Sequence, residues 1–269
     1  MSRLHLHILG SGSKGNCALI EGPQGLIMVD DGLSRRETLK RMAELGLSAD
    51  NVSALFVTHE HSDHIKGLDV WCKHWRGPLF ASRNTLASKE SLAHVPVEEF
   101  DPGDVLEIAG VRIQTYSTSH DVINPVGYRF DALGDSIGFA TDTGELSSHA
   151  IDTLKDCRVL ALESNHDVAM LRQGDYPRFL QERILSAKGH LSNDQAANAA
   201  RELVTVRTEQ LIAMHISQDN NRPSLTVKSY ARALDATLDD EIGSTATRHS
   251  GSRELTIRPA GQYRPMSIQ

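Results

Sequence analysis

The chain has 269 residues, 39% hydrophobic and 23% charged, as expected for a soluble globular protein of one large domain or two small ones. The formal net charge of −7 argues against unselective nucleic-acid binding through bulk charge, although not against a local basic groove. The three isolated cysteines indicate neither a disulfide framework nor a cysteine zinc site. Because the sequence has no signal-peptide core and no run of about 20 apolar residues, we expect a cytoplasmic protein without a membrane partner.

In chain order, the sequence begins with a predicted strand over residues 4–9, a glycine-rich turn over residues 10–16, and a hairpin. The turn lacks the GxxxxGK[ST] order and precedes a strand, so it predicts a tight turn bordering a pocket rather than a phosphate cradle. Ser34 and Glu37 form the capping box of a predicted helix that ends at Gly46.

The rest of the chain continues this alternation of strands and helices. Further strands are predicted at residues 54–58, 111–117, 126–130, 136–140, 158–162 and 211–214, and helices at 177–187, 193–208 and 225–238. The alternation favours a layered α/β architecture with strands packed face to face and helices outside. Residues 243–269 are rich in Ser, Thr, Gly, Pro and Arg, which predicts a partly disordered C-terminal tail with at most one short strand.

The segment His59-Glu60-His61-Ser62-Asp63-His64 is the strongest functional signal. It lies between an apolar strand and a segment that can start a helix, so His59 and His61 point the same way while Asp63 and His64 aim at a second point. Imidazoles with a carboxylate suit zinc, manganese or iron, and two metals about 3.5–4 Å apart can hydrolyse phosphate esters or carbonyl compounds. The alternative is a solvated polar turn, but ordinary loops rarely carry four such side chains in six positions.

Three more ligand-type residues each follow a predicted strand: His120, Asp142 and His215. A single histidine at a strand end is more often hydrogen-bonded structure than a metal ligand. Strand ends nevertheless carry functional groups in sheet proteins, and several of them in one chain favour a common site.

Together these residues resemble the signature of the metallo-β-lactamase superfamily, HxHxDH followed by a histidine, an aspartate and a last histidine. The resemblance covers residues 4–235 and implies an α/β (α+β) fold, the four-layer αββα sandwich, in a hydrolase domain of residues 1–242. It implies two divalent metal ions (Zn, Mn or Fe), with Asp142 bridging them. The ligand sets it implies are His59, His61 and His120 for one metal and Asp63, His64 and His215 for the other.

Finer blocks of sequence look like the YycJ/WalJ-type branch, which is regarded as carrying metal-dependent nuclease activity, proposed to be 5′-to-3′ exonuclease action on DNA. These blocks are residues 10–17, 119–121, 160–167, 188–193 and 215–221. They are also similar to tRNase Z, and on that parallel Glu163 and His190 form an acid/base pair while His215 is a metal ligand. His190 is the alternative last ligand. We favour His215 because it directly ends an apolar strand.

The resemblance implies a metal-activated hydroxide as nucleophile. Asp63 would orient the water or accept its proton, and His190, held by Glu163, would protonate the leaving alkoxide. The alternative is that Glu163 and His190 only orient metal ligands. The residues that bind substrate and the oligomeric state are left open by the sequence.

Other functions are compatible with the same site. The chain could hydrolyse a small thioester, lactone or cyclic phosphodiester, or it could be a metal-binding scaffold without turnover. Four arginines of the tail, Arg248, Arg253, Arg258 and Arg264, favour a DNA substrate only weakly, since such runs are usually solvated. The absence of a glycine- and proline-rich arm argues against tRNA processing. We interpret His166 as a residue that either orients a metal ligand or fixes a loop. His74 is expected at the surface, and His5 and His7 are expected to face solvent or the sheet edge.

Overall fold

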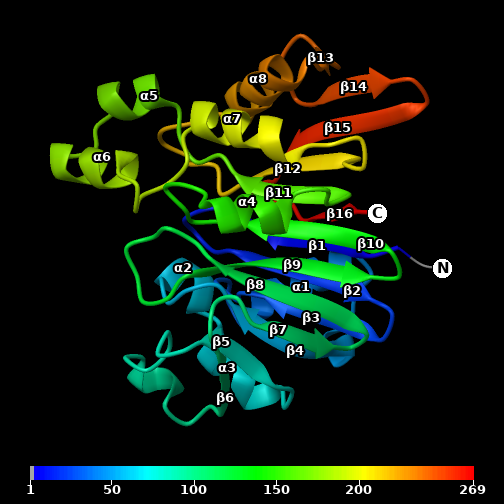
Figure 1. The fold of residues 1–269 in the computed structure, drawn as a ribbon. Coiled ribbons are helices and arrows are strands. Elements are labelled where there is room, and N and C mark those ends of the chain that lie inside the picture. Colours follow the sequence, from blue (N-terminus) through cyan, green and yellow to red (C-terminus); the bar gives the residue numbers. More distant parts are fainter. Residues whose placement is uncertain (1–2) are drawn as a thin grey trace. The chain divides into compact units, whose positions relative to one another are not determined.

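The computed structural model describes residues 3–269 and contains helices and strands in two sheets (Figure 1). The chain divides into two compact units. Unit 1 holds the described residues up to Ser117 together with Val122–Asp135 and Gly261–Gln269, and unit 2 holds Thr118–Asp121 and Ser136–Ala260. Within residues 3–269, no helix has the length and apolar character needed to cross a membrane.

Unit 1 contains a sheet of seven strands in the order β16-β1-β2-β3-β4-β5-β6. The strands are β1 (His5–Gly10), β2 (Cys17–Gly22), β3 (Gly25–Val29), β4 (Val52–Val57), β5 (Leu79–Ser82), β6 (Val97–Phe100) and β16 (Met266–Ile268). Strands β3 to β6 are parallel, so their carboxyl ends meet at one edge of the sheet. Strand β4 is nearly all buried, in keeping with its apolar run over residues 54–57.

Short helices and an antiparallel group of strands complete unit 1. They are α1 (Arg35–Glu44), α2 (Ser62–Ile65), α3 (Leu68–His74), the 3-10 turns at Ala49–Asn51 and Glu90–Leu92, and β7 (Val105–Ile108), β8 (Val111–Ser117) and β9 (Val126–Ala132). Ser34 caps α1 as predicted, but the Glu37 carboxylate accepts from Arg41 Nε at 2.8 Å. Met42 of α1 and Trp71 of α3 are buried in one cluster with Leu55 of β4.

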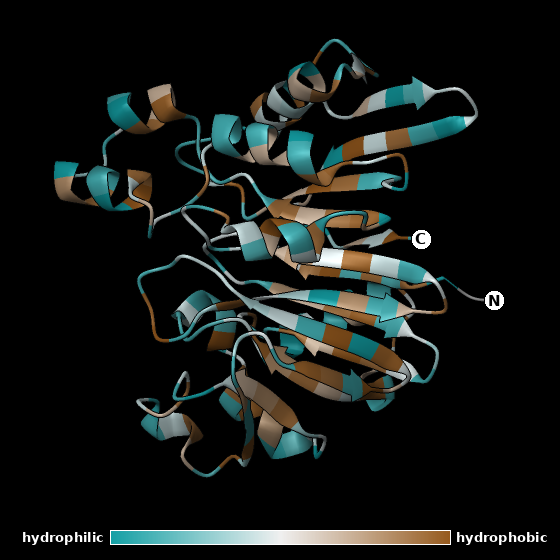
Figure 2. Cartoon of the chain, in the orientation of Figure 1, coloured by the Kyte–Doolittle hydropathy of each residue, from teal (hydrophilic) through white to brown (hydrophobic). Residues whose placement is uncertain are grey.

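Unit 2 is built around parallel strands. Its strands follow the order β13-β14-β15-β12-β11-β10. They are β10 (Asp135–Ala140, of which Asp135 belongs to unit 1), β11 (Val159–Glu163), β12 (Gln210–Met214), β13 (Thr237–Leu238), β14 (Ala246–Ser250) and β15 (Arg253–Pro259). Strands β10, β11, β12 and β15 run parallel, and β11 and β12 are hydrophobic over much of their length (Figure 2).

The helices of unit 2 differ in how deeply they are packed. They are α4 (Ser148–Leu154), α5 (Val168–Gln173), α6 (Arg178–Leu185), α7 (Asn193–Leu203) and α8 (Pro223–Leu234). A capping box of Ser192 and Gln195 starts α7, and a proline in its first turn starts α8. Both α7 and α8 bury a face, whereas α6 buries no residue.

The expectation of at most one short strand in residues 243–269 is wrong, because the segment forms β14, β15 and β16. Leu255 and Ile257 alternate with exposed or half-buried residues along β15, and β15 lies in parallel register with β12. The arginine-rich composition hid this short alternation. A domain boundary after residue 242 stays a prediction.

The outlying histidines have different surroundings. His74 is exposed, as expected. His7, however, is buried, and its ring nitrogens lie 2.7 Å from Ser267 Oγ and 3.0 Å from Glu21 Oε2. Since β16 flanks β1, His7 is not at the edge of the sheet, and the expected exposure is wrong for this residue.

Candidate metal centre

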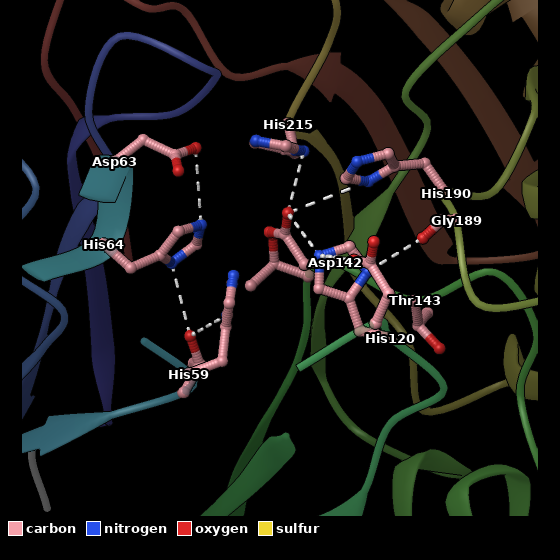
Figure 3. A network of polar contacts seen from close by, with 12 residues as sticks. His59, Asp63, His64, His120, Asp142, Thr143, Gly189, His190 and His215 are labelled. Carbon is pink, nitrogen blue, oxygen red and sulfur yellow. Dashed lines mark hydrogen bonds and ion pairs between the residues drawn. The ribbon is translucent and has the colours of Figure 1, made fainter. Parts of the chain in front are cut away.

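The HxHxDH cluster of unit 1, formed by His59, His61, Asp63 and His64, spans the predicted strand-to-helix junction. His59 and His61 lie in the turn after β4, and Asp63 and His64 lie within α2. The ring centroids of His59 and His64 are 4.0 Å apart, and those of His59 and His61 are 4.8 Å apart. His64 Nε2 lies 3.7 Å from Asp63 Oδ2 (Figure 3). His59 and His64 are almost fully buried, so rigid elements hold both rings.

A buried carboxylate that sequence analysis missed, Asp30, orients this cluster. His64 Nδ1 lies 2.7 Å from Asp30 Oδ2, and the backbone N–H and hydroxyl of Thr58 each donate to Asp30 at 2.8 Å. With its proton given to Asp30, the Thr58 hydroxyl accepts from His59 Nδ1 at 3.0 Å. This chain of bonds leaves Nε2 of both His59 and His64 as the nitrogen suited to a metal ion.

The glycine-rich turn borders the same cluster. Asn16 Nδ2 lies 3.0 Å from His64 Nε2 and 3.2 Å from Asp63 Oδ2, while the Asn16 N–H donates to the Asp63 carbonyl at 2.7 Å. Within the turn, Asn16 Oδ1 accepts from the Gly12 N–H. The turn therefore positions the HxHxDH loop, in line with the interpretation of a tight turn.

The Glu163 cluster of unit 2 contains the other predicted residues: His120, Asp142, Glu163, His190 and His215. Asp142 follows β10, Glu163 ends β11 and His215 follows β12, so parallel pairing brings them to one edge of the strands. Four of them, Asp142, Glu163, His190 and His215, offer ligand atoms that all lie within 4.8 Å of one another.

Backbone strain marks three strand ends in the two clusters. Asp142 and His215 have φ of 50°, and Asp30 in unit 1 has φ of 59°. Left-handed backbone is uncommon for residues other than glycine and gathers at functional sites.

Glu163 is the centre of the second cluster. Its Oε1 lies 2.7 Å from His190 Nδ1 and 3.2 Å from His215 Nδ1, and its Oε2 accepts from the Thr143 N–H at 2.8 Å. Burial favours the protonated acid, but the charge and hydrogen bond of His190, with the bond from His215, hold the pKa of Glu163 below its ordinary value. The carboxylate is therefore ionised and able to orient both rings.

The remaining members of this cluster are fixed in the same manner. His120 Nδ1 donates to the Gly189 carbonyl at 3.0 Å, and burial lowers the pKa of His120, which favours the neutral imidazole (Figure 3). Asn165 Nδ2, another residue that sequence analysis missed, donates to the His215 carbonyl at 2.9 Å. The one sequence feature that could have pointed to Asn165 is its place within the block 160–167, which resembles the YycJ/WalJ-type branch.

The donor chemistry of both clusters fits divalent metal ions. In His59, His64, His120, His190 and His215 the Nδ1 atom lies next to a protein oxygen. Such bonds fix the tautomer that presents Nε2 to a metal, and imidazole with carboxylate suits zinc, manganese or iron. The predicted ligand sets draw on both clusters and stay predictions. His190 and His215 both turn Nδ1 to Glu163, so the choice of last ligand between them also stays a prediction.

Comparison with known proteins identifies the family. Residues 26–216 match the model of the beta-lactamase superfamily domain. The exodeoxyribonuclease YycJ of Bacillus anthracis is 36% identical over 236 residues, which cover 86% of this chain and 89% of that protein. The chain belongs to the YycJ-type hydrolases of the metallo-β-lactamase superfamily.

Two further similarities agree with this membership. A ribonuclease Z of Mycobacterium avium is 28% identical over 179 residues, covering 52% of this chain and 63% of that protein. The crystal structure of the metallo-beta-lactamase fold protein YhfI of Bacillus subtilis superposes with a TM-score of 0.70 at 14% identity, covering 99% of this chain and 100% of that chain. The predicted family and α/β metallo-β-lactamase fold class are thereby confirmed, and the chain is a metal-dependent hydrolase whose fold implies divalent metal binding.

Proposed function

We propose that this YycJ-type hydrolase is a phosphodiesterase that acts as a 5′-to-3′ exonuclease on DNA. The observation that carries the proposal is the pair of Glu163 and His190, whose Oε1 and Nδ1 atoms lie 2.7 Å apart in a cluster with Asp142 and His215. The similarity to an exodeoxyribonuclease over most of both chains supports DNA as the substrate.

His190 has the surroundings of a general acid. Its side chain is 16% exposed, whereas that of Glu163 is fully buried. Because Nδ1 is bonded to an ionised carboxylate, the ring is held in one orientation. Nε2 then donates its proton to the alkoxide that leaves the phosphorus atom, a step typically worth about 10²- to 10⁴-fold in rate.

The metal ligands in this proposal are those that the family signature implies. On that signature, His59, His61 and His120 would hold one ion, Asp63, His64 and His215 would hold the other, and Asp142 would serve both. When bound, the ions would supply a water activated for attack and positive charge beside the phosphoryl group. Asp63 has a side chain 20% exposed, so it can also contact that water and orient it.

The test is a metal-dependent digestion time course on single-stranded and duplex DNA and RNA, each labelled at the 5′ or 3′ end. We expect mononucleotides to be released first from 5′ ends of DNA, and Asp63→Ala to abolish release. Release from 3′ ends would contradict the polarity. Wild-type protein that cleaves no polymer with manganese, zinc or iron would contradict the proposal.

A further inference from the structure

Helices α5 and α6 of unit 2 form a segment with little of its own core. Leu171 is the one buried residue of α5, and α6 buries none. Neither helix packs extensively against another helix or strand of the described chain, and in Figure 1 both are drawn clear of the strands of their unit. Phe179 on α6 is 74% exposed, an uncommon state for a phenylalanine.

This segment is joined at both ends to the Glu163 cluster. It leaves β11 directly after Glu163 and returns through Lys188 and Gly189 to His190. The hydrogen bond between Glu163 and His190 closes the loop at its base. At the returning end the Gly189 carbonyl accepts from His120 Nδ1. The two helices are therefore connected to the acid/base pair by short segments of chain, residues 164–167 before α5 and residues 186–189 after α6.

Among the exposed charged side chains of residues 168–188, four are basic and two, Asp175 and Glu182, are acidic. Arg172, Arg178 and Lys188 are exposed, and none of them forms an ion pair with another residue of the described chain. A fourth cation, Arg183, is engaged by Asp121, with Arg183 Nη2 2.9 Å from Asp121 Oδ1. With these charges, residues 168–188 carry a formal net charge of +2 on a chain whose net charge is −7.

We propose that α5 and α6 form a holding arm for a single-stranded DNA segment, with Phe179 stacking on an unpaired base and Arg172, Arg178 and Lys188 contacting phosphates. The proposal rests on the nuclease function above and names how that substrate is held. An exposed aromatic ring beside unpaired cations is the combination that binds single strands without sequence preference, since every base has a face to stack on. The complementary charge favours this occupant over an apolar protein partner.

The first measurement is binding of a fluorescent single-stranded oligonucleotide by anisotropy, with Asp63→Ala added to every variant so that no cleavage occurs. Phe179→Ala should weaken binding by about 5- to 100-fold, and Phe179→Tyr should restore it because a second aromatic ring can stack. Arg178→Ala should lower the slope of log Kd against log salt by about 0.7, as for one lost contact to a single strand. Val206→Ala is the matched control, because Val206 is 67% exposed and lies outside the arm.

The second measurement compares substrates on chains with an intact Asp63. Hydrolysis of bis(p-nitrophenyl) phosphate should stay within about twofold of wild type in Phe179→Ala, while KM for single-stranded DNA rises. Equal losses on both substrates would show that the arm only supports the Glu163 cluster, and would overturn the proposal. Unchanged DNA binding by Phe179→Ala would also overturn the proposal. So would a wild-type dimer that the Phe179→Ala substitution dissociates while KM for single-stranded DNA stays unchanged. If DNA binds through Phe179 but the wild type never cleaves it, the proposed nuclease function is refuted and the proposed binding arm is not.

Discussion

At the residue scale, the candidate centre depends on oxygen atoms that fix histidine rings. Asp30 holds His64 in unit 1, and Glu163 holds His190 and His215 in unit 2. Each carboxylate is buried and also accepts from a backbone N–H, that of Thr58 or of Thr143. Partners of this kind set the tautomer and basicity of a metal-binding imidazole.

Substitution of Asp30 tests this positioning role. Asp30→Asn keeps the volume but removes the charge that His64 contacts at 2.7 Å, so we expect metal affinity to fall by about 10- to 100-fold. Metal-binding titrations of the chelator-treated protein measure the effect. An affinity equal to that of wild type would contradict the role assigned to Asp30.

His190 and His215 can be separated by metal content. We expect His215→Ala to lose bound metal, whereas His190→Ala should keep its metal and lose about 10²- to 10⁴-fold in kcat. Elemental analysis of both purified variants beside the wild type decides between the assignments. Loss of metal from His190→Ala with retention in His215→Ala would make His190 the last ligand.

At the element scale, close backbone contact between turns sets the shape of the HxHxDH cluster. Gly32 lies against the segment of Asp63, and a Cβ atom there would be 1.6 Å from the Asp63 carbonyl oxygen and 2.8 Å from the Asn16 backbone nitrogen. The turn at 10–16, the residues after β3 and the start of α2 are therefore packed backbone to backbone. Only glycine fits this contact.

Gly32→Ala should consequently destabilise the protein by about 1–3 kcal/mol or more, because backbone atoms have to move. Thermal unfolding measures the loss as a lower Tm. Gly261→Ala is the matched control, since its nearest neighbour would be 3.6 Å away and no positive φ is involved. An equal effect of the two substitutions would refute the packing argument.

The helices and strands differ in how well they could be predicted from the sequence. Strand β4 and the HxHxDH turn were predictable because their signals are contiguous, as were β11 and β12 with their buried apolar runs. The role of Asp30 was not, since it depends on the parallel pairing of β3 with β4 across more than 20 residues of sequence. Strands β14 and β15 were missed because their pairing with each other and with β12 overrides a composition typical of loops.

At the scale of the whole molecule, a buried histidine couples stability to pH. His166 is fully buried, and within the described chain neither of its ring nitrogens has a hydrogen-bond partner. Its backbone carbonyl accepts from the Asn193 N–H without involving the ring, so the expected role of the side chain stays a prediction. Burial lowers the pKa of His166 from 6.5 to about 4. The folded state therefore favours the neutral ring.

The unfolded chain binds a proton at His166 near pH 6.5, where the folded chain does not, so stability falls as pH decreases. This contribution is complete above pH 6.5 and is lost as pH falls through about 4, with a limit of about 3 kcal/mol. Urea unfolding at pH 7.5 and 4.5 should show a weaker pH dependence in His166→Leu than in wild type or in the exposed control His74→Leu. The same dependence in all three proteins would refute this assignment.

The central claim, that His190 held by Glu163 protonates the leaving alkoxide of a phosphodiester, is tested most directly by changing the leaving group. One measurement suffices: kcat/KM of wild type and His190→Ala on a DNA dinucleotide and on bis(p-nitrophenyl) phosphate. A p-nitrophenolate leaves without a proton, so the account predicts a loss of about 10²-fold or more for the dinucleotide and less than about tenfold for the nitrophenyl ester. Equal losses on both substrates would contradict it.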